Sequence, residues 1–145
     1  MGKLLQRLSD ASRSGVYCAP RTDEILDAVQ GSALRVARIG LEGVAGKAAL
    51  MERIARALRF PEWFGGNWDA LEDCLSDLSW LDAAGHVLIF EGTQGIAADE
   101  GGVLADILAS AASYWAGRGR PFFAVFVGGA ALLPAHLPEL YRDRK

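Results

Sequence analysis

Two nearly unbroken apolar segments constrain the fold of this chain more than any other feature of its sequence. His86–Glu91 (HVLIFE) and Pro121–Val127 (PFFAVFV) lack the polar alternation of half-exposed strands, so they predict strands buried on both faces of a sheet. Leu34–Leu41 (LRVARIGL) alternates apolar and basic residues and predicts another strand. Segments with helical periodicity separate these strands, which favours parallel pairing through right-handed crossovers. We therefore expect an α/β fold in which a small parallel sheet of three or four strands is packed by helices.

The predicted helices occupy the intervals between the strands. Apolar residues at helical spacing predict helices over Lys47–Arg59, Trp68–Leu78 and Val103–Trp115. The acidic segment Gly92–Gly102 contains several glycines and is expected to be a loop. Near the N-terminus, Val16–Ala19 predicts a short strand that ends before Pro20. Thr22 is then expected to cap a small helix that ends at Gly31.

The chain length suits one domain, because 145 residues can bury a sizeable core. Within it we expect an N-terminal extension over residues 1–33 packed on the core, a main domain over 34–130 and a C-terminal tail over 131–145. The tail's last five residues, YRDRK, are expected to fray. No apolar stretch follows Met1, and the longest apolar run, residues 122–133, is too short to span a bilayer. These features predict a cytoplasmic protein.

Acidic residues are concentrated in one part of the chain. Residues 61–117 contain ten Asp and Glu residues and no Lys or Arg, although the net charge of the whole chain is only −3. Phosphate binding requires positive charge, so we do not expect this part to bind nucleic acid directly. A basic protein is the expected partner.

The acidic part begins with a hydrophobic loop that leads into a helix, FPEWFGGNWDALEDCLSDL (residues 60–78). Pro61 is expected to end the preceding helix, Gly65-Gly66 permits a sharp reversal, and Asn67 is a good N-cap. Apolar residues at helical spacing form a stripe that can face the core: Trp68, Leu71, Leu75 and Leu78. Acidic residues form a row along the exposed side: Asp69, Asp73 and Asp77, with Glu72 beside them.

Aromatic residues are dense around this loop. We expect Trp80 in the core, whereas Trp63 and Phe64 lie in a loop bounded by Pro and Gly that cannot easily bury both rings. Taken alone, the acidic row would be an ordinary solvated helix face. An exposed aromatic ring beside carboxylates is typical of an interface anchor, so the combination favours a surface for a cationic partner.

Motifs for phosphate or zinc binding are incomplete. Gly43–Lys47 (GVAGK) follows the first predicted strand, but Leu41 stands where a phosphate loop has its first Gly, and Ala48 where it has Ser or Thr. The segment is therefore predicted to be a turn. The two histidines, His86 and His136, lack the spacing of zinc ligands, and His86 is expected at a strand edge.

One enzymatic alternative stays open, in which Asp69, Glu72 and Asp73 serve a hydrolase or hold a metal ion. No second polar cluster accompanies these residues, so we expect no catalytic residue, metal or cofactor. Cys18 and Cys74 belong to no recognisable motif. Cys74 is predicted to be a small core residue, and the pattern suits free thiols in a reducing compartment, although two cysteines also allow one disulfide.

The loop and acidic helix resemble the binding segment of barstar-family proteins, the intracellular inhibitors of barnase-type ribonucleases. The resemblance is carried by Pro61-Glu62, Trp63, Phe64, Gly65, Asn67, Asp69-Ala70-Leu71 and Asp73-Cys74-Leu75. It implies a small parallel sheet packed by helices, and inhibition by occlusion of the nuclease's active site. Asp73 would take the place of a substrate phosphate, Asp69 would pair with a neighbouring cation, and Trp63 with Gly65 would cover the base-binding edge.

We therefore predict a ribonuclease inhibitor of the antitoxin type, not an enzyme, that is monomeric when free and binds a secreted or toxin-type ribonuclease. Its predicted partner-binding residues are Trp63, Phe64, Gly65, Asn67, Asp69, Glu72, Asp73 and Ser76. Glu72 stands where the best-known member of that family has a bulky aromatic residue. The alternative is a general protein-interaction module that uses the same surface on another basic partner, and a merely structural domain would leave the exposed aromatics unexplained.

Overall fold

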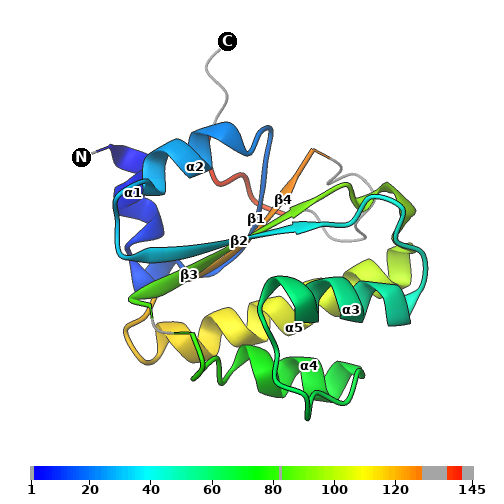
Figure 1. Cartoon of the computed structure of the whole chain (residues 1–145). Coiled ribbons are helices and arrows are strands. Elements are labelled where there is room, and N and C mark those ends of the chain that lie inside the picture. The colour runs from blue at the N-terminus through cyan, green and yellow to red at the C-terminus, as the bar shows by residue number, and fades with distance from the viewer. Residues whose placement is uncertain (1, 82, 129–136, 142–145) are drawn as a thin grey trace.

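The computed structural model describes residues 2–81, 83–128 and 137–141, and it has a parallel four-stranded sheet between two layers of helices (Figure 1). The strands are β1 (Gly15–Ala19), β2 (Leu34–Gly40), β3 (Gly85–Glu91) and β4 (Phe122–Val127). Their order across the sheet is β1-β4-β3-β2. The predicted α/β fold with a small parallel sheet is confirmed, and the fourth strand is the segment before Pro20.

The two apolar segments form the two central strands. In β3, His86 to Phe90 are all buried, and in β4 the same holds from Phe122 to Phe126. Phe90 pairs with Phe126 in the register, and their rings stack with centroids 4.8 Å apart. Helices cover both faces of these strands, which explains why their sequences lack polar alternation.

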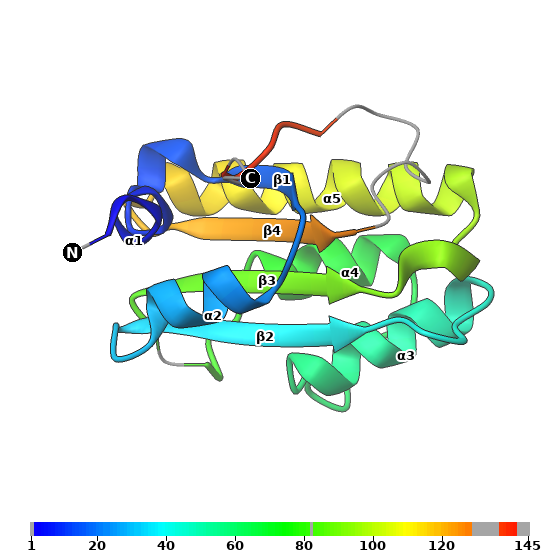
Figure 2. The same cartoon turned by 90° about the horizontal axis from the view of Figure 1, so that it is seen from above.

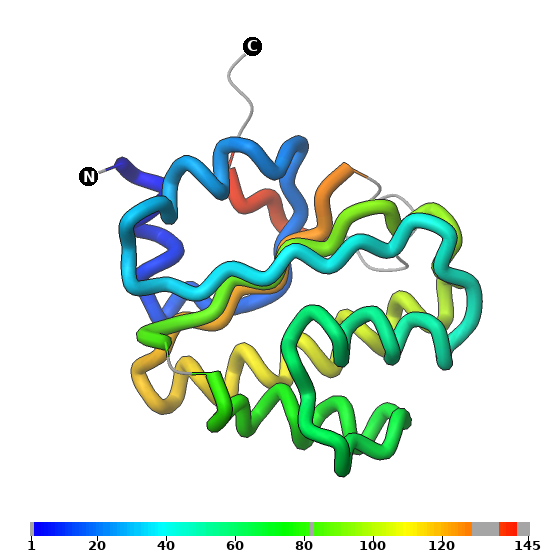
Figure 3. Tube along the Cα trace, viewed as in Figure 1, coloured from blue at the N-terminus to red at the C-terminus, as the bar shows by residue number. Residues whose placement is uncertain are grey.

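The helices are divided between the two faces of the sheet. α1 (Lys3–Leu8) and α2 (Asp23–Val29) cover one face, and α3 (Lys47–Ala57), α4 (Trp68–Leu75) and α5 (Ala98–Ala116) cover the other (Figures 1 and 2). Two short 3₁₀ helices, η1 (Ala11–Arg13) and η2 (Thr93–Gly95), lie in the connections. Alternate residues of β3 serve the two cores: Val87 and Ile89 pack toward α1 and α2, Leu88 and Phe90 toward α3 to α5. The Cα trace shows α4 on the outside of its layer, far from α1 (Figure 3).

Residues 137–141 lie along the outer edge of β1. The Cys18 N–H donates to the Pro138 carbonyl at 2.9 Å, and the Leu140 N–H donates to the Cys18 carbonyl at 2.8 Å. Leu140 is fully buried, and the Tyr141 hydroxyl donates to the Arg21 carbonyl at 2.9 Å. Tyr141 is thus held in place, contrary to the expected fraying, and the rest of YRDRK lies outside the described residues.

The start of α5 was predicted five residues too late. The helix begins at Ala98 and includes Gly101 and Gly102, which we expected in a loop. Asp99 and Glu100 lie in its first turn, where the helix dipole favours carboxylates. Gly101 is buried, so packing against the rest of the fold outweighs the low helix propensity of glycine.

Two further local predictions were wrong. Thr22 precedes α2 but makes no capping hydrogen bond; its hydroxyl donates instead to Glu91 Oε2 at 2.6 Å. His86 is not at a strand edge but buried within β3, 2% exposed. Burial, followed by the charges of Arg35 and Arg120, lowers the pKa of His86 to about 4.

Candidate partner-binding surface

The loop between α3 and α4, residues 58–67, turns sharply at both ends. Arg59 adopts a left-handed conformation with φ of +56°, directly after Leu58, the C-cap of α3. The Phe64 N–H donates to the Pro61 carbonyl at 3.0 Å and closes a tight turn. Gly66 has φ of +72°, a conformation that favours glycine, and it directs the chain into α4.

Asn67 caps α4, as predicted. Its backbone is extended, and its side-chain oxygen accepts a hydrogen bond from the Ala70 N–H at 2.8 Å. Asp69 lies in the first turn of the helix, where the helix dipole favours its negative charge. The cap therefore fixes where the helix begins and which way its carboxylates project.

The helix ends earlier than predicted, with Ser76 as its C-cap. The N–H groups of Asp77 and Leu78 both donate to the Cys74 carbonyl at 3.1 Å, and Leu78 adopts a left-handed φ of +49°. This turn buries the Leu78 side chain. Asp77 consequently lies beyond the helix, and the predicted row of carboxylates along α4 stops at Asp73.

The inner side of α4 packs against α5. Leu71, Cys74 and Leu75 are fully buried, as the apolar stripe predicted. The Trp115 indole N–H of α5 donates to the Leu75 carbonyl at 2.8 Å. Cys74 is a free thiol whose pKa burial raises to about 11, and Cys18 is also free. These contacts hold α4 rigidly on the outside of the fold.

The acidic side chains of α4 point away from this core. Asp69 and Asp73 are exposed, and Glu72 is half-buried. The ion pairs between described residues form elsewhere: Arg13–Asp10, Arg21–Glu24, Arg38–Glu91 and Arg56–Glu52. No Lys or Arg in the described ranges therefore neutralises Asp69 or Asp73, and their negative field is directed at solvent.

The loop carries two neighbouring aromatic rings, and they differ in exposure. Trp63 is 62% exposed, whereas Phe64 is half-buried and packs edge-on against Phe60 with centroids 4.9 Å apart. Trp80 lies behind Trp63, and its indole N–H donates to the Leu58 carbonyl at 2.9 Å. Trp63, more than Phe64, thus has the exposure of an interface anchor.

The predicted site residues form one continuous stretch over the loop and α4. Trp63, Gly65, Asn67, Asp69 and Asp73 are exposed, and Phe64, Glu72 and Ser76 are half-buried. Sequence reasoning missed Ser110 of α5, whose hydroxyl donates to Glu72 Oε2 at 3.0 Å. Ser110 carries no sequence signal for this contact, because 38 residues separate it from Glu72. We define the acidic surface as the eight predicted residues.

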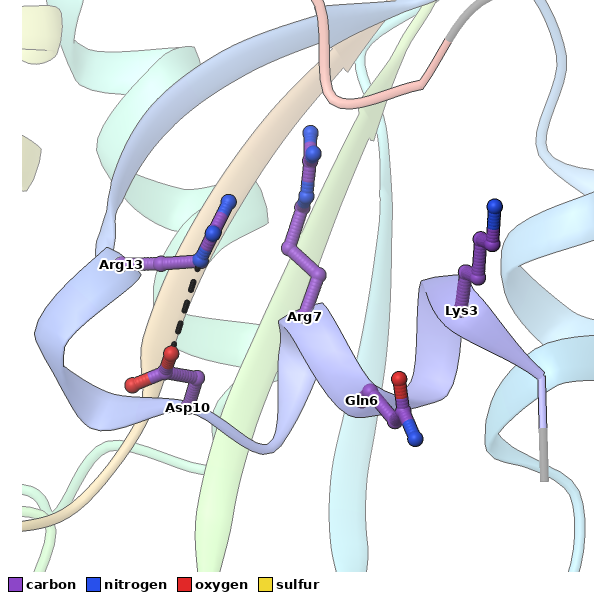
Figure 4. A pocket seen from close by; sticks show the side chains of 5 residues that line it. All are labelled: Lys3, Gln6, Arg7, Asp10 and Arg13. Atoms are coloured by element: carbon purple, nitrogen blue, oxygen red, sulfur yellow. Dashed lines mark ion pairs between the residues drawn. The ribbon is translucent and has the colours of Figure 1, made fainter.

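A recess on the other side of the sheet has the opposite charge. It has a volume of about 290 Å³ and is lined by Lys3, Gln6, Arg7, Asp10 and Arg13. Its three basic side chains extend to the same side, and Arg13 Nε lies 3.5 Å from Asp10 Oδ2 (Figure 4). Arg7 donates to the Leu140 carbonyl at 2.6 Å. The recess and the acidic surface share no residue, and the Arg7 hydrogen bond joins α1 to residues 137–141.

In the described part of the chain, no group of three or more His, Cys, Asp or Glu residues is arranged to hold a metal ion. None of the helices found there combines the length and apolar character needed to cross a membrane.

Fold and surface together define a small parallel α/β domain that exposes an acidic helix beside a tryptophan. Residues 34–127 match the model of the family described as Barstar (barnase inhibitor), which spans more than half of the chain. The chain belongs to the Barstar family. Proteins of this family are inhibitors rather than enzymes.

The fold also occurs within a larger protein. The crystal structure of Cdc6p from Pyrobaculum aerophilum matches 88% of this chain with a TM-score of 0.59 and 15% sequence identity. The matched region is only 38% of that chain. At this identity the likeness concerns the fold alone. Among curated proteins, no relative matches this sequence.

Proposed function

We propose that this protein inhibits a ribonuclease by docking α4 and residues 58–67 onto the enzyme's basic active site. The observation that carries the proposal is the pair of exposed carboxylates, Asp69 and Asp73, without a cation from the described residues and next to the exposed Trp63 loop. The family match supports the same mode of binding. The proposed partner is a secreted or toxin-type ribonuclease, met in the cytoplasm by a monomeric inhibitor.

The chemistry of a ribonuclease site explains why carboxylates would block it. Such a site must hold a phosphodiester, so it presents cationic donors to an anion. Asp73 projects from a helix that is capped by Asn67 and packed on α5, so its carboxylate is positioned before binding. In the proposed complex, Asp73 replaces the substrate phosphate and Asp69 pairs with a neighbouring cation.

The loop residues have complementary roles in the proposal. Trp63 and Gly65 cover the edge of the site that holds the base, because both are exposed at the tip of the loop. Asn67 keeps the loop in register with the helix. Phe64, Glu72 and Ser76 are half-buried and complete the surface around them.

The proposal is tested by inhibition assays with a barnase-type ribonuclease and the isosteric variants Asp69→Asn and Asp73→Asn. Removing one partner of a desolvated charge pair costs about 2–5 kcal/mol or more, which is at least roughly 30-fold in Kd; the barnase–barstar pair is itself one of the systems behind this estimate. The control is Asp27→Asn, which removes an exposed charge from α2 on the opposite face. Unchanged inhibition by both α4 variants, with the fold intact by circular dichroism, contradicts the proposal.

One observation favours a second candidate function, binding of a basic partner that is not a nuclease. Glu72 brings a third carboxylate to the acidic surface where the best-known family member has an aromatic ring, so this surface departs from the one that fits a barnase-type ribonuclease. A pull-down from the host with wild type and Trp63→Ala separates the two candidates. A protein without ribonuclease activity, captured by wild type and lost with Trp63→Ala, favours the second.

A further inference from the structure

A chain of four aromatic rings connects the exposed Trp63 to the core. Phe64 packs on Phe60 at 4.9 Å, Phe60 on Trp80 at 5.9 Å, and Trp80 on Trp63 at 6.3 Å between centroids. The last two contacts are both edge-to-face, with interplanar angles of 87°. Among the described residues, Trp80 is the one ring in contact with Trp63.

A hydrogen bond to the C-terminal end of α3 fixes the position of Trp80. Its indole N–H donates to the Leu58 carbonyl at 2.9 Å, at the start of the loop that carries Trp63. Trp80 follows α4 in the sequence, whereas Trp63 precedes it. The Trp80 side chain therefore joins the segments at the two ends of α4, and it fixes the loop relative to the helix that bears Asp69 and Asp73.

The contact with Trp80 restricts the orientation of the exposed Trp63 ring. A tryptophan that is 62% exposed, with Gly65 and Gly66 after one intervening residue, has little packing of its own to select one orientation. Edge-to-face contact with a fixed ring selects one. A ring that is already oriented loses less conformational freedom on binding, which improves affinity without any new contact.

We propose that Trp80 is a positioning residue for partner binding, which holds the Trp63 ring in the orientation that the partner meets. The inference rests on the proposed function, and it assigns to Trp80 an effect on affinity that acts through Trp63 rather than through contact with the partner. It also predicts that the two tryptophans are energetically coupled.

A double-mutant cycle measures this coupling, with Trp63→Ala and Trp80→Leu made singly and together and the Kd for a barnase-type ribonuclease determined for each. If loss of the Trp80 ring leaves Trp63 in its binding orientation only about a tenth of the time, Trp80→Leu weakens binding about tenfold. Trp80→Phe retains a ring edge and should recover part of the loss. In the Trp63→Ala background, Trp80→Leu should weaken binding less than about twofold.

Two further measurements separate positioning from general destabilisation. Val29→Ala truncates a buried side chain on the opposite face of the sheet; it lowers the melting temperature as a control and should leave the Kd unchanged. In the free protein, the heteronuclear NOE of the Trp63 indole N–H should fall in Trp80→Leu and stay at the wild-type value in Val29→Ala.

The outcomes distinguish this inference from the proposed function. Additive losses in the double mutant, an unchanged Trp63 NOE, or an unchanged Kd for Trp80→Leu each overturn the role of Trp80. In those cases a loss of binding by Asp73→Asn still supports the proposed function. If Asp73→Asn and Trp63→Ala both bind as wild type does, the proposed function fails and the inference fails with it.

Discussion

Ser110 of α5 donates a hydrogen bond of 3.0 Å to the carboxylate of Glu72 on α4. The contact orients one of the three carboxylates on α4, and it joins the acidic helix to the helix that packs beneath it. A partner that binds the Glu72 carboxylate therefore competes with this hydroxyl for Oε2.

Ser110→Ala should destabilise the protein by about 0.5–1.5 kcal/mol, the range of an ordinary hydrogen bond, because the bond to Glu72 lies at the exposed surface, where solvent screens its charge. Ser113→Ala is the matched control, since Ser113 is exposed on the same helix and gains the same helix propensity. Urea denaturation of both variants measures the difference. Equal midpoints would show that the Ser110–Glu72 contact contributes nothing to stability.

Asn67→Ala should destabilise the protein by about 1 kcal/mol through loss of the N-cap of α4. Asn67→Ser retains a capping oxygen and should restore most of the loss. Thermal unfolding gives both values. If Asn67→Ser is as unstable as Asn67→Ala, the cap is not the cause of the change.

Association with the partner should slow as the salt concentration rises. The exposed charges of Asp69 and Asp73 act over a Debye length that shortens from roughly 10 Å at 0.1 M to roughly 3 Å at 1 M ionic strength. Stopped-flow measurements should show the association rate falling steeply and the dissociation rate changing little. Asp73→Asn should reduce the salt slope, whereas Asp27→Asn on α2 should keep it. A salt-independent association rate would exclude steering by this surface.

Stability should fall as the pH drops from about 6.5 toward 4 because of His86. Its pKa in the folded protein is lowered to about 4, mainly by burial, so the unfolded chain binds a proton in this range and the folded protein does not. Between about pH 7 and pH 5, the free energy of unfolding should fall by about 2 kcal/mol. Chemical denaturation at each pH tests this. His86→Leu should lack the dependence; if it keeps the wild-type slope, another group is responsible.

Leu140→Ala should destabilise the protein by about 2–5 kcal/mol, because Leu140 is fully buried in the core beneath α1 and α2. Leu137 lies three residues earlier and is only half-buried, so Leu137→Ala should cost less. Calorimetry compares the two. A small effect of Leu140→Ala would support our division of the chain, in which residues 131–145 are a tail.

Much of the fold could be predicted because its signals are local. The runs that became β3 and β4 are apolar whichever helices cover them, and the cap at Asn67 needs only the next three residues. The end of α4 was missed because Leu78 adopts a left-handed conformation that leucine rarely takes. Its burial stabilises that conformation, and burial depends on residues distant in the sequence.

The sequence by itself determined the parallel α/β arrangement, the acidic charge of residues 61–117 and the start of the helix that carries Asp69 and Asp73. Only the tertiary structure decided that Trp63 is exposed while Phe64 is half-buried, that Ser110 donates a hydrogen bond to Glu72 and that the Trp80 ring contacts the Trp63 ring. The physical reason is the range of the interactions. Periodicity, capping and charge act between near neighbours, whereas exposure and ring packing depend on segments that meet only once the chain has folded.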